Sequence, residues 1–503
     1  MGVVRTRQKR RRFQLPNKGE ITALAVGHEL NSVYAGTASG QIIRMGLPAG
    51  ALEKSVDVIG ATPDPAVAVT LLRFLHGGST LIAGDQKGRV FSAQVVRGKK
   101  NIFRVEWVHA FQAHAHPVTL ISYSQRDKGF VTGDASGLLQ YHYATSGQTE
   151  YTLASGLPGD LAGLVLAPKG DGLLALDRNG RLGHWRVDHP HPGITWNALF
   201  GEVRYEGYSD AQYMWQSTGG TDEFEPKFSL VPLIFGTLKG TFYALFFAAP
   251  LALLAAFYAS QFMHRSLMRV VKPTVEYMAA LPSVVLGFLG ALWLAPRVEE
   301  LLPSMLLMPL VVLLMVFAFR FLSDFTEMKH LITQRPGVEF WILLALVLGG
   351  GVLAVFLGEW CEAVFFGGDF RPWVRSTLGL TYDQRNSLVV GMAMGFSVVP
   401  IIFTIAEDSL SSVPQHLTAA SLALGATRWQ TALRVVLPTA SPGIFSGVMI
   451  GFGRAVGETM IVLMATGNTP VMDLSPFTGF RALSANIAVE LPEAPEGGTL
   501  FRV

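Results

Sequence analysis

The stretch TAASLALGATRWQTALRVVLP, residues 418–438, lies between two long apolar segments of the chain. It is amphipathic and mildly basic, it contains Gly425, and it ends at Pro438. Glycine permits a sharp change of direction between two short helices, and proline disfavours the continuation of a helix. The stretch therefore predicts a helical hairpin at a membrane surface, whose second helix ends at Pro438 where the chain enters the bilayer.

Charged residues are few and unevenly distributed along the chain. Of 503 residues, 50% are hydrophobic and 15% are charged, whereas a soluble globular protein has about 25% charged residues. Most of the charges fall in residues 1–228, and long apolar runs dominate residues 229–466. This division predicts a multi-domain chain, with a water-soluble part followed by a membrane-embedded part.

The charge balance does not indicate a nucleic acid partner. The net charge is only +3, and the basic cluster RTRQKRRRF at residues 5–13 stands alone. We interpret residues 1–20 as a basic tail that is solvated or lies against membrane lipid. The single cysteine, Cys361, lies in an apolar segment, so no disulfide can form within the chain.

Residues 21–200 contain four copies of one pattern, in which two apolar strands are followed by a tight turn and a third strand. The turn glycines, spaced by 48, 49 and 43 residues, are Gly40, Gly88, Gly137 and Gly180. A period of about 40–50 residues with several strands per unit indicates the blades of a β-propeller. The pattern resembles the WD-repeat class, although the Trp-Asp dipeptide is missing. We expect an all-β propeller-like domain of about four blades at 21–200, joined to the membrane part by a linker at 201–228.

No catalytic constellation is visible in this β-rich part. Two His-x-His pairs fall in expected loops, His114 with His116 and His189 with His191. Metal binding by these pairs is the less favoured alternative, because no carboxylate or cysteine ligands are arranged around them. We therefore expect no cofactor and no metal.

Six segments of the membrane part are apolar and long enough to cross a bilayer as helices. They are residues 229–262, 274–296, 304–322, 339–360, 387–406 and 443–466. Together they predict an all-α polytopic membrane domain at 229–490. Lysine and arginine in short loops favour the cytoplasmic side, which assigns to it the loops at 264–272, 327–335 and 418–438. Alternation then places residues 1–228 and the loop 367–386 outside.

An outer domain requires a preceding span or a signal peptide, and residues 1–20 have no apolar core. We therefore expect the chain to be a fragment that lacks an N-terminal span, with residues 491–503 as a truncated C-terminal segment. The alternative is that the β-rich domain stays in the cytoplasm and that one predicted span is false.

The stretch at 418–438 resembles the EAA loop of ABC-importer permeases, whose pattern is Glu-Ala-Ala, three residues, Gly, nine residues, Ile, one residue, Leu-Pro. The residues that occupy the pattern here are Ala419, Ala420, Ser421, Gly425, Val435, Leu437 and Pro438. Ala419 replaces the glutamate of the pattern, which removes a charge, and Val435 replaces the isoleucine. The resemblance implies a coupling helix that docks on a separate ATP-hydrolysing subunit. An ordinary amphipathic interfacial loop is the alternative.

Three further motifs resemble the phosphate-specific transport permeases of the PstC/PstA type. They are AALPSVVLGFLG at 279–290, VVPIIFTIAEDSLSSVP at 398–414 and GFGRAVGETMIV at 451–462. The resemblance covers about residues 229–490 and implies the type I ABC importer permease fold.

Arg454 and Glu458 stand four residues apart in the last of these motifs, which predicts that they share one face of a helix inside an apolar span. Charges in a span cost about a few kcal/mol each and usually face a partner or a water-filled path. By the resemblance, this is the charged pair on which transport depends. Arginine offers forked donors to phosphate oxygens, and the glutamate would hold the guanidinium when the path is empty. A static ion pair that only orients the helix is the alternative.

No P-loop pattern occurs in the chain, so we expect a transporter subunit in the inner membrane rather than an enzyme. The resemblance implies three protein partners: an ATP-binding subunit, a second permease subunit and a periplasmic phosphate-binding protein. Two functions remain open. One is a permease for phosphate or for another oxyanion such as sulfate, and the other is a membrane-anchored propeller that binds a ligand or a protein and signals.

Overall fold

The computed structural model describes residues 20–27, 32–46, 56–64, 67–97, 103–158, 160–206, 208, 210–220, 224–324 and 338–503. Two features expected from the sequence, the basic cluster at 5–13 and the loop at 327–335, lie outside the described residues. The chain divides into two compact units. Met1–Val231 together with Ala494–Val503 form the β unit, and Pro232–Glu493 form the helical unit.

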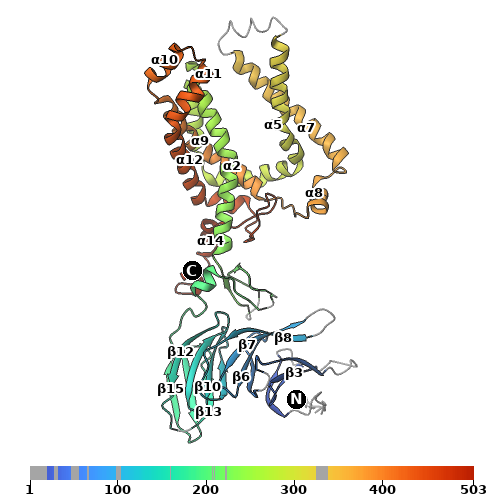
Figure 1. The fold of residues 1–503 in the computed structure, drawn as a ribbon, viewed down its shortest axis with the longest axis vertical. Coiled ribbons are helices and arrows are strands. Elements are labelled where there is room, and N and C mark those ends of the chain that lie inside the picture. The colour runs from blue at the N-terminus through green and yellow to red at the C-terminus, as the bar shows by residue number, and fades with distance from the viewer. Residues whose placement is uncertain are drawn as a thin grey trace, which may run out of the picture. The chain divides into compact units, whose positions relative to one another are not determined.

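The β unit is built from antiparallel sheets of consecutive strands (Figure 1). Three sheets have four strands each, β1–β4, β5–β8 and β9–β12, and a fourth has three strands, β13–β15. The strands are β1 (Ile21–Val26), β2 (Ser32–Thr37), β3 (Gln41–Gly46), β4 (Val56–Ala61), β5 (Val69–Phe74), β6 (Thr80–Asp85), β7 (Val90–Arg97), β8 (Phe103–Ala110), β9 (Val118–Tyr123), β10 (Gly129–Asp134), β11 (Leu138–Tyr143), β12 (Gln148–Ala154), β13 (Leu161–Leu166), β14 (Gly172–Asp177) and β15 (Leu182–Arg186). Strands β1, β5, β9 and β13 contact one another in that order. Successive sheets thus lie next to each other as the blades of a propeller do.

The turn between the second and third strands of each sheet contains the glycine that the repeat pattern singled out. The backbone φ angles of Gly40, Gly88, Gly137 and Gly180 are 73°, 80°, 85° and 80°, a region that glycine enters without steric cost. At Gly88 there is also no room for a side chain, because a Cβ atom would lie 2.3 Å from the carbonyl oxygen of His114. The four hairpins therefore form where the sequence predicts them.

The third sheet holds a buried chain of polar side chains. Thr132 Oγ1 lies 2.8 Å from His114 Nε2 and 2.8 Å from His142 Nε2, and His114 Nδ1 lies 3.3 Å from Asp134 Oδ2. Burial lowers the pKa of His142 to about 3 and lowers the pKa of His114. His114 thus has protein partners in the core. It is one of the two histidines of the first His-x-His pair, which was considered for metal binding. Among the described residues, no group of three or more His, Cys, Asp and Glu side chains is placed to hold a metal ion.

The last part of the β unit leads toward the membrane helices. It comprises helix α1 (Trp196–Phe200) and the paired strands β16 (Trp215–Gln216) and β17 (Lys227–Phe228). The short C-terminal helix α15 (Thr499–Arg502) belongs to the same unit, where Thr499 Oγ1 lies 3.2 Å from His191 Nδ1.

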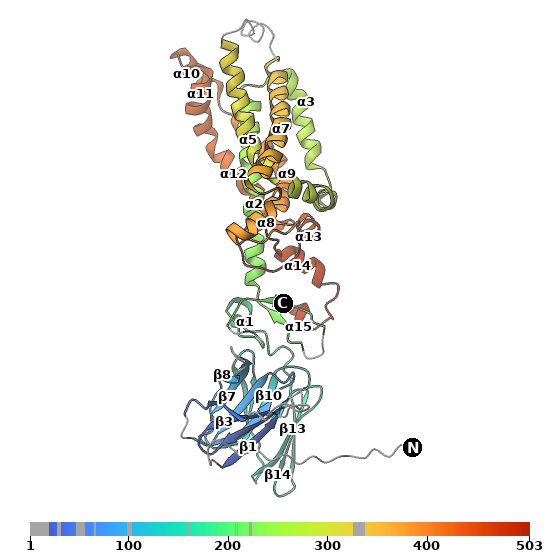
Figure 2. The ribbon, with the colours of Figure 1, turned by 90° about the vertical axis from the view of Figure 1, so that its right-hand side faces the viewer.

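The helical unit contains long apolar helices and short connecting helices (Figure 2). They are α2 (Val231–Gln261), α3 (Arg265–Ala279), α4 (Ser283–Leu289), the π-helical turn η2 (Gly290–Leu294), α5 (Ala295–Asp324), α7 (Val338–Phe365), α8 (Phe370–Trp373), η3 (Val374–Leu378), α9 (Ser387–Ser411), α10 (Gln415–Ala423), α11 (Arg428–Thr431), η4 (Ala432–Val436), α12 (Leu437–Gly457), α13 (Met460–Ala465) and α14 (Leu483–Glu490).

Among the described residues, five helical segments are long and apolar enough to cross a membrane. They are Val231–Gln261, Ser283–Leu322, Trp341–Phe365, Ser387–Ser411 and Arg428–Gly457. The sequence predicted six such segments, and the second of them, 274–296, does not form a separate long helix. The second and third predicted spans fall largely in one helical run of 40 residues, because the helix continues through Pro303 and Pro309. Membrane helices tolerate proline where neighbouring groups satisfy the freed carbonyl oxygens.

Small residues allow the central helices to approach closely. Alanines recur every four residues along α2, at Ala244, Ala248, Ala252 and Ala256, and all four are fully buried. They belong to the same core cluster as Val398 and Ile402 of α9. A Cβ atom at Gly451 of α12 would lie 2.6 Å from Ile402 Cγ1. Close backbone packing of this kind is the usual basis of helix association in a membrane.

Several short elements of the helical unit lie at its two ends (Figures 1 and 2). Helices α10 and α11 lie at one end, and α8 and α14 lie toward the other. The N-terminal part of α2 is at the second end as well, because Thr237 Oγ1 accepts a hydrogen bond from the backbone N–H of Leu483, at the start of α14, at 3.0 Å. The segments 418–438 and 367–386 therefore lie at opposite ends, as the alternation of the predicted spans requires.

Candidate functional site

The 418–438 segment forms a helical hairpin that bends at a glycine. Helix α10 ends at Ala423, and Gly425 follows with φ of 86°. The backbone N–H groups of Gly425 and Ala426 donate to the carbonyl oxygens of Leu422 and Ser421, at 3.0 and 3.2 Å. These bonds satisfy carbonyl groups that the end of a helix leaves open, as left-handed glycine caps do. Gly425 is therefore the residue that turns the chain.

The second arm of the hairpin begins with a capping box. Thr427 Oγ1 accepts from the backbone N–H of Gln430 at 3.2 Å, and Gln430 Oε1 accepts from the backbone N–H of Thr427 at 2.9 Å. This reciprocal arrangement satisfies two N–H groups at the start of a helix. The hydroxyl oxygens of Ser421 and Thr431 lie 2.9 Å apart and join the two arms.

Pro438 does not end a helix, which corrects one prediction from the sequence. Helix α11, the π-helical turn η4 and α12 form one helical run from Arg428 to Gly457. Pro438 lies in the first turn of α12. The hydroxyl group of Thr439 donates to the carbonyl oxygen of Val435 at 2.6 Å. The wider π turn thus carries the helix past the position where proline lacks a donor.

The hairpin presents apolar side chains outward. No residue of α10 is buried, and the side chain of Leu424 at the bend is 91% exposed. Trp429 is 56% exposed, and its ring contacts the rings of Phe257 and Phe262 near the end of α2. Of the residues matching the loop pattern, Ala419, Ala420, Gly425 and Pro438 are exposed, and Ser421, Val435 and Leu437 are half-buried. These ring contacts join the exposed apolar surface to the end of α2, and an exposed apolar patch of this kind is typical of an interaction site.

The structure separates the predicted pair of Arg454 and Glu458. Helix α12 ends at Gly457, and Glu458 has an extended backbone with φ of −70° and ψ of 124°. The two residues therefore do not share a helical face, and no ion pair joins them. Glu458 is 9% exposed, and its Oε1 lies 3.4 Å from the backbone N–H nitrogen of Ile461 in the first turn of α13. The carboxylate thus stabilises the start of α13, where a negative charge is favourable.

The helix break between α12 and α13 is fixed by neighbouring elements. The hydroxyl group of Ser484 donates to the carbonyl oxygen of Glu458 at 3.0 Å. Gly287 of α4 lies so close that a Cβ atom there would be 2.9 Å from the carbonyl oxygen of Met460. Irregular backbone at membrane depth is tolerated only where protein or a water-filled path surrounds it. The break therefore marks a place where the membrane part can hold polar groups.

Arg454 lies on the exposed side of α12 in the last turn before the break. A positive charge at a helix C-terminus is favourable. The same side of the helix exposes Ser446, Ile450, Gly453 and Gly457. An exposed arginine on an apolar span would be costly against lipid, so this side of α12 is suited to a partner or to a polar path.

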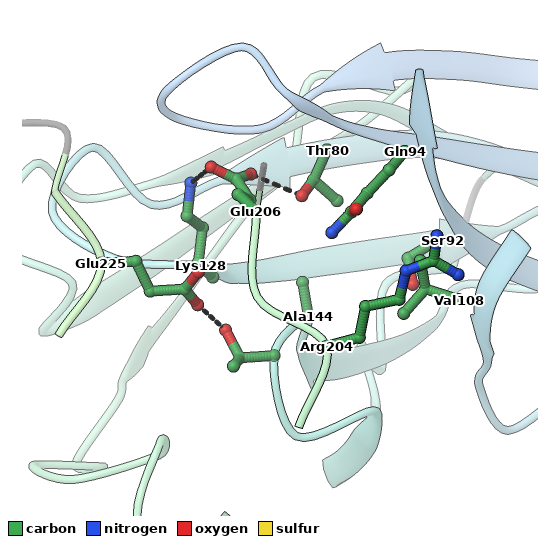
Figure 3. A pocket seen from close by; sticks show the side chains of 10 residues that line it. Thr80, Ser92, Gln94, Val108, Lys128, Ala144, Arg204, Glu206 and Glu225 are labelled. Carbon is green, nitrogen blue, oxygen red and sulfur yellow. Dashed lines mark hydrogen bonds and ion pairs between the residues drawn. The ribbon is translucent and has the colours of Figure 1, made fainter. Parts of the chain in front are cut away.

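The β unit contains a buried polar pocket that is an alternative site (Figure 3). Lys128 Nζ donates to Glu206 Oε2 at 2.7 Å and to the carbonyl oxygen of His76 at 2.6 Å. Thr80 Oγ1 donates to Glu206 Oε1 at 2.5 Å, and the hydroxyl group of Thr145 donates to the Glu225 carboxylate. Burial raises the pKa of Glu225. The pocket has about 10 Å³ of free space, which is about enough for one water molecule. These contacts attach Glu206 and Glu225, on the segment that follows the blades, to the strands and turns of the blades.

A buried lysine of the first span was missed in the sequence. Lys239 of α2 is 3% exposed, and its ammonium group donates to Thr478. The signal was visible, because a lysine in an apolar helix is as unusual as the arginine in α12. The contact of Lys239 with residues 466–482, however, is formed only in the tertiary structure, so the sequence did not predict it.

Together, the long apolar helices and the helix break that carries charged residues define a polytopic membrane protein. The model of the family of binding-protein-dependent transport system inner membrane components matches residues 248–500. The chain belongs to this family. It is therefore a multi-pass inner-membrane permease of an ABC transporter, not an enzyme itself, and its family works with an ATPase and a binding protein.

Several curated proteins resemble the chain. The probable ABC transporter permease protein YqgH of Bacillus subtilis is 25% identical over 292 residues, which cover 58% of this chain and 69% of that protein. The phosphate transport system permease protein PstC of Pasteurella multocida is 26% identical over 266 residues, covering 53% and 65%. PstA 1 of Mycobacterium tuberculosis (strain H37Rv) is 36% identical over 132 residues, covering 26% and 42%. The chain thus spans about two thirds of the length of the first two and less than half of the third.

The β unit resembles solved propeller structures only loosely. The WD40 repeats of RRP9 match with a TM-score of 0.29 and 15% identity over 34% of this chain and 49% of that chain. The β-propeller domain of Cps50 (Swd1) from Myceliophteria thermophila matches with a TM-score of 0.28 and 18% identity over 34% and 52%. The description of the β unit as propeller-like rests on its own sheets.

Proposed function

We propose that the chain imports inorganic phosphate as one permease subunit of an ABC importer. The observation that carries this proposal is Arg454, a guanidinium on the exposed side of an apolar span at a helix break. The curated relatives named above include phosphate transport system permeases. A phosphate anion needs charge-assisted donors wherever it leaves water.

Arg454 is proposed to be the anion-binding group of the path. Its planar guanidinium can donate two parallel hydrogen bonds to a phosphate group. Glu458 is proposed to hold the break open in the correct geometry by capping α13, because its carboxylate lies at the start of that helix. The sequence instead suggested that Glu458 holds the guanidinium group of Arg454, and the capping role replaces that suggestion.

A second permease subunit is proposed to cover the exposed side of α12. Ser446, Gly453 and Gly457 on that side are small, and small residues let two membrane helices approach closely. Arg454 would then lie at the interface between the two permease subunits, where it is shielded from lipid. The path would run between the subunits.

The 418–438 hairpin is proposed to dock on the ATP-binding subunit. Leu424 and Trp429 offer exposed apolar area, and the pattern residues Ala419, Ala420, Ser421, Gly425, Val435, Leu437 and Pro438 form the bend and its two arms. The hairpin end of the helical unit is then cytoplasmic. Since α2 starts at the opposite end, the β unit that precedes α2 is proposed to be periplasmic, as a binding or regulatory surface near the periplasmic phosphate-binding protein.

The test is uptake of radiolabelled phosphate by cells that produce the chain with its partner subunits. We expect saturable, ATP-dependent uptake. Unlabelled phosphate should compete with the radiolabelled phosphate, and sulfate should not. Competition by sulfate with equal strength would assign the transporter to another oxyanion. Absence of uptake at normal abundance of the assembled complex would contradict the proposal.

A further inference from the structure

Lys239 is a buried cation without a carboxylate partner. It is 3% exposed, and within the described residues no acidic oxygen lies within 4.0 Å of its ammonium group. Its hydrogen bonds go to Thr478, at 2.9 Å to Oγ1 and 3.5 Å to the carbonyl oxygen. Asp473 and Asp383 act on it through space. A buried ammonium group that is held only by neutral oxygens is costly, so its presence in a packed span points to a use.

Three donors converge on one oxygen atom beside this lysine. The carbonyl oxygen of Thr478 accepts from Lys239 Nζ, from the Ser387 hydroxyl group at 2.6 Å and from the Ser387 backbone N–H at 3.1 Å. Ser387 is fully buried at the first turn of α9. An ammonium, a hydroxyl and a helix N-terminal amide that point at one place form a set of donors suited to an oxyanion.

The oxygen that fills this place belongs to a segment without regular structure. Residues 466–482 run back across the helices, held by the Thr466 hydroxyl group, which donates to the Phe480 carbonyl oxygen at 2.6 Å, and by the Tyr243 hydroxyl group, which donates to the Leu474 carbonyl oxygen at 2.8 Å. Phe480 is fully buried against Gly240. The segment thus covers the donors at the end of the helical unit opposite to the α10–α11 hairpin.

We propose that Lys239 and Ser387 form an oxyanion-binding site at the entrance of the transport path, which Thr478 occupies in this closed state. This inference rests on the proposed function and adds the place where the anion first leaves water. An arriving tetrahedral oxyanion would replace the Thr478 oxygens on the ammonium and hydroxyl groups and release the 466–482 segment. Asp473 and Asp383 offset the lysine charge while the site is closed.

The site is tested by phosphate uptake with the full chain and its partners. Lys239→Gln should reduce the ratio of uptake rate to KM about 10- to 100-fold, because a charge-assisted hydrogen bond is lost. Lys239→Arg should keep part of the activity. Thr241→Val is the matched control, since Thr241 is equally buried on α2 and its hydroxyl group bonds only to the Thr237 carbonyl oxygen. This control should transport as the wild type does.

Thr478→Val distinguishes an anion-binding role of Lys239 from a purely structural role in which Lys239 only holds the 466–482 segment. The variant keeps the carbonyl group and removes the hydroxyl group that competes for Lys239, so we expect KM for phosphate to fall a few-fold. If Lys239 only holds the segment in place, Thr478→Val should impair uptake in the same way as Lys239→Gln, and that result would overturn the site. Wild-type KM and rate in Lys239→Gln would also overturn it while leaving the proposed function intact. If the wild type moves neither phosphate nor sulfate, the proposed function and the site both fail.

Discussion

The hydroxyl groups of Ser421 and Thr431 lie 2.9 Å apart and join the two arms of the α10–α11 hairpin across Gly425. The hairpin is therefore a preformed element, with its bend set by one glycine and its second arm set by a capping box. Leu424 at its tip is almost fully exposed. A preformed apolar tip of this kind is what the proposed docking on the ATP-binding subunit requires.

Gly425→Val should abolish docking of the ATP-binding subunit. The glycine has φ of 86°, and a β-branched residue in that conformation costs about 1–3 kcal/mol. Nothing lies within 4 Å of a Cβ atom there, so the effect comes from backbone strain and not from a clash inside the chain. The measurement is co-purification of the ATPase from membranes.

Gly425→Asn is the matched control, because asparagine tolerates the left-handed region better than valine. It should retain much of the ATPase. Both variants should insert into the membrane in normal amounts. Full co-purification with Gly425→Val would count against the docking role of the hairpin.

The β unit should be labelled only from the periplasmic side. In a Cys361→Ser background, Asn179→Cys places a thiol at an exposed hairpin turn, and Leu424→Cys places one at the tip of the α10–α11 hairpin. A membrane-impermeant maleimide added to intact spheroplasts should label position 179 and leave position 424 unlabelled. Labelling of position 424 alone would reverse the orientation.

The β unit should lose stability in mild acid because of its buried histidines. The pKa of His142 is lowered to about 3 in the folded state, whereas a histidine in the unfolded chain titrates near 6.5. Between these values the unfolded state binds a proton that the folded state does not. The free energy of unfolding should therefore fall as pH falls below about 6.5, by up to about 1.4 kcal/mol per pH unit for this group. The pKa of His114 is also lowered, and its titration adds to the same trend.

Urea unfolding of the detergent-solubilised protein, followed by pulse proteolysis of the β unit at pH 7.5 and 5.5, measures this effect. His142→Gln, which keeps a polar partner for Thr132, should have a smaller difference between the two pH values. His184→Gln, at an exposed histidine, should behave as the wild type. An equal pH dependence in His142→Gln and in the wild type would refute this assignment.

The pocket in the β unit should be sensitive to removal of one charge and tolerant of removal of both (Figure 3). Lys128→Met leaves the half-buried Glu206 carboxylate without its cation, which costs up to about 3 kcal/mol. The 201–228 segment should then become susceptible to proteases in the folded protein. The double variant Lys128→Met with Glu206→Gln should recover most of the protection, whereas equal cleavage of the single and double variants would exclude the ion pair as the attachment.

Local signals allowed a large part of the fold to be predicted from the sequence. The glycines of the four hairpins and Gly425 could be identified because a positive φ angle restricts the choice of residue at a single position. The long apolar segments were also visible. The second and third predicted spans were not separated as expected, because Pro303 lies inside a continuing helix. The surrounding helices determine whether a proline breaks a helix or is tolerated.

The candidate site was less predictable because it depends on tertiary contacts. Arg454 and Glu458 have the spacing of one helical turn, but the helix ends between them where Ser484 binds the Glu458 carbonyl oxygen. Lys239 meets Thr478, 239 positions further along the chain, and no pattern of local residues reveals such a contact.

The two charged residues at the helix break should differ in how their removal acts. Glu458→Gln removes the negative charge that stabilises the start of α13, so it should reduce both uptake and the abundance of the assembled complex. The exchange of Arg454 to Glu together with Glu458 to Arg should not restore uptake, because no ion pair joins the two side chains. Recovery by this exchange would instead indicate a direct pair in another state of the transporter.

The most direct test of phosphate import through this chain is uptake of radiolabelled phosphate by Arg454→Gln, with complex abundance measured in the same membranes. Glutamine keeps much of the side-chain volume and removes the charge that an anion needs after it leaves water. We predict that uptake falls at least about tenfold, the loss of a charge-assisted hydrogen bond, while the assembled complex remains at wild-type abundance. Wild-type uptake by Arg454→Gln at equal abundance would contradict the proposed path.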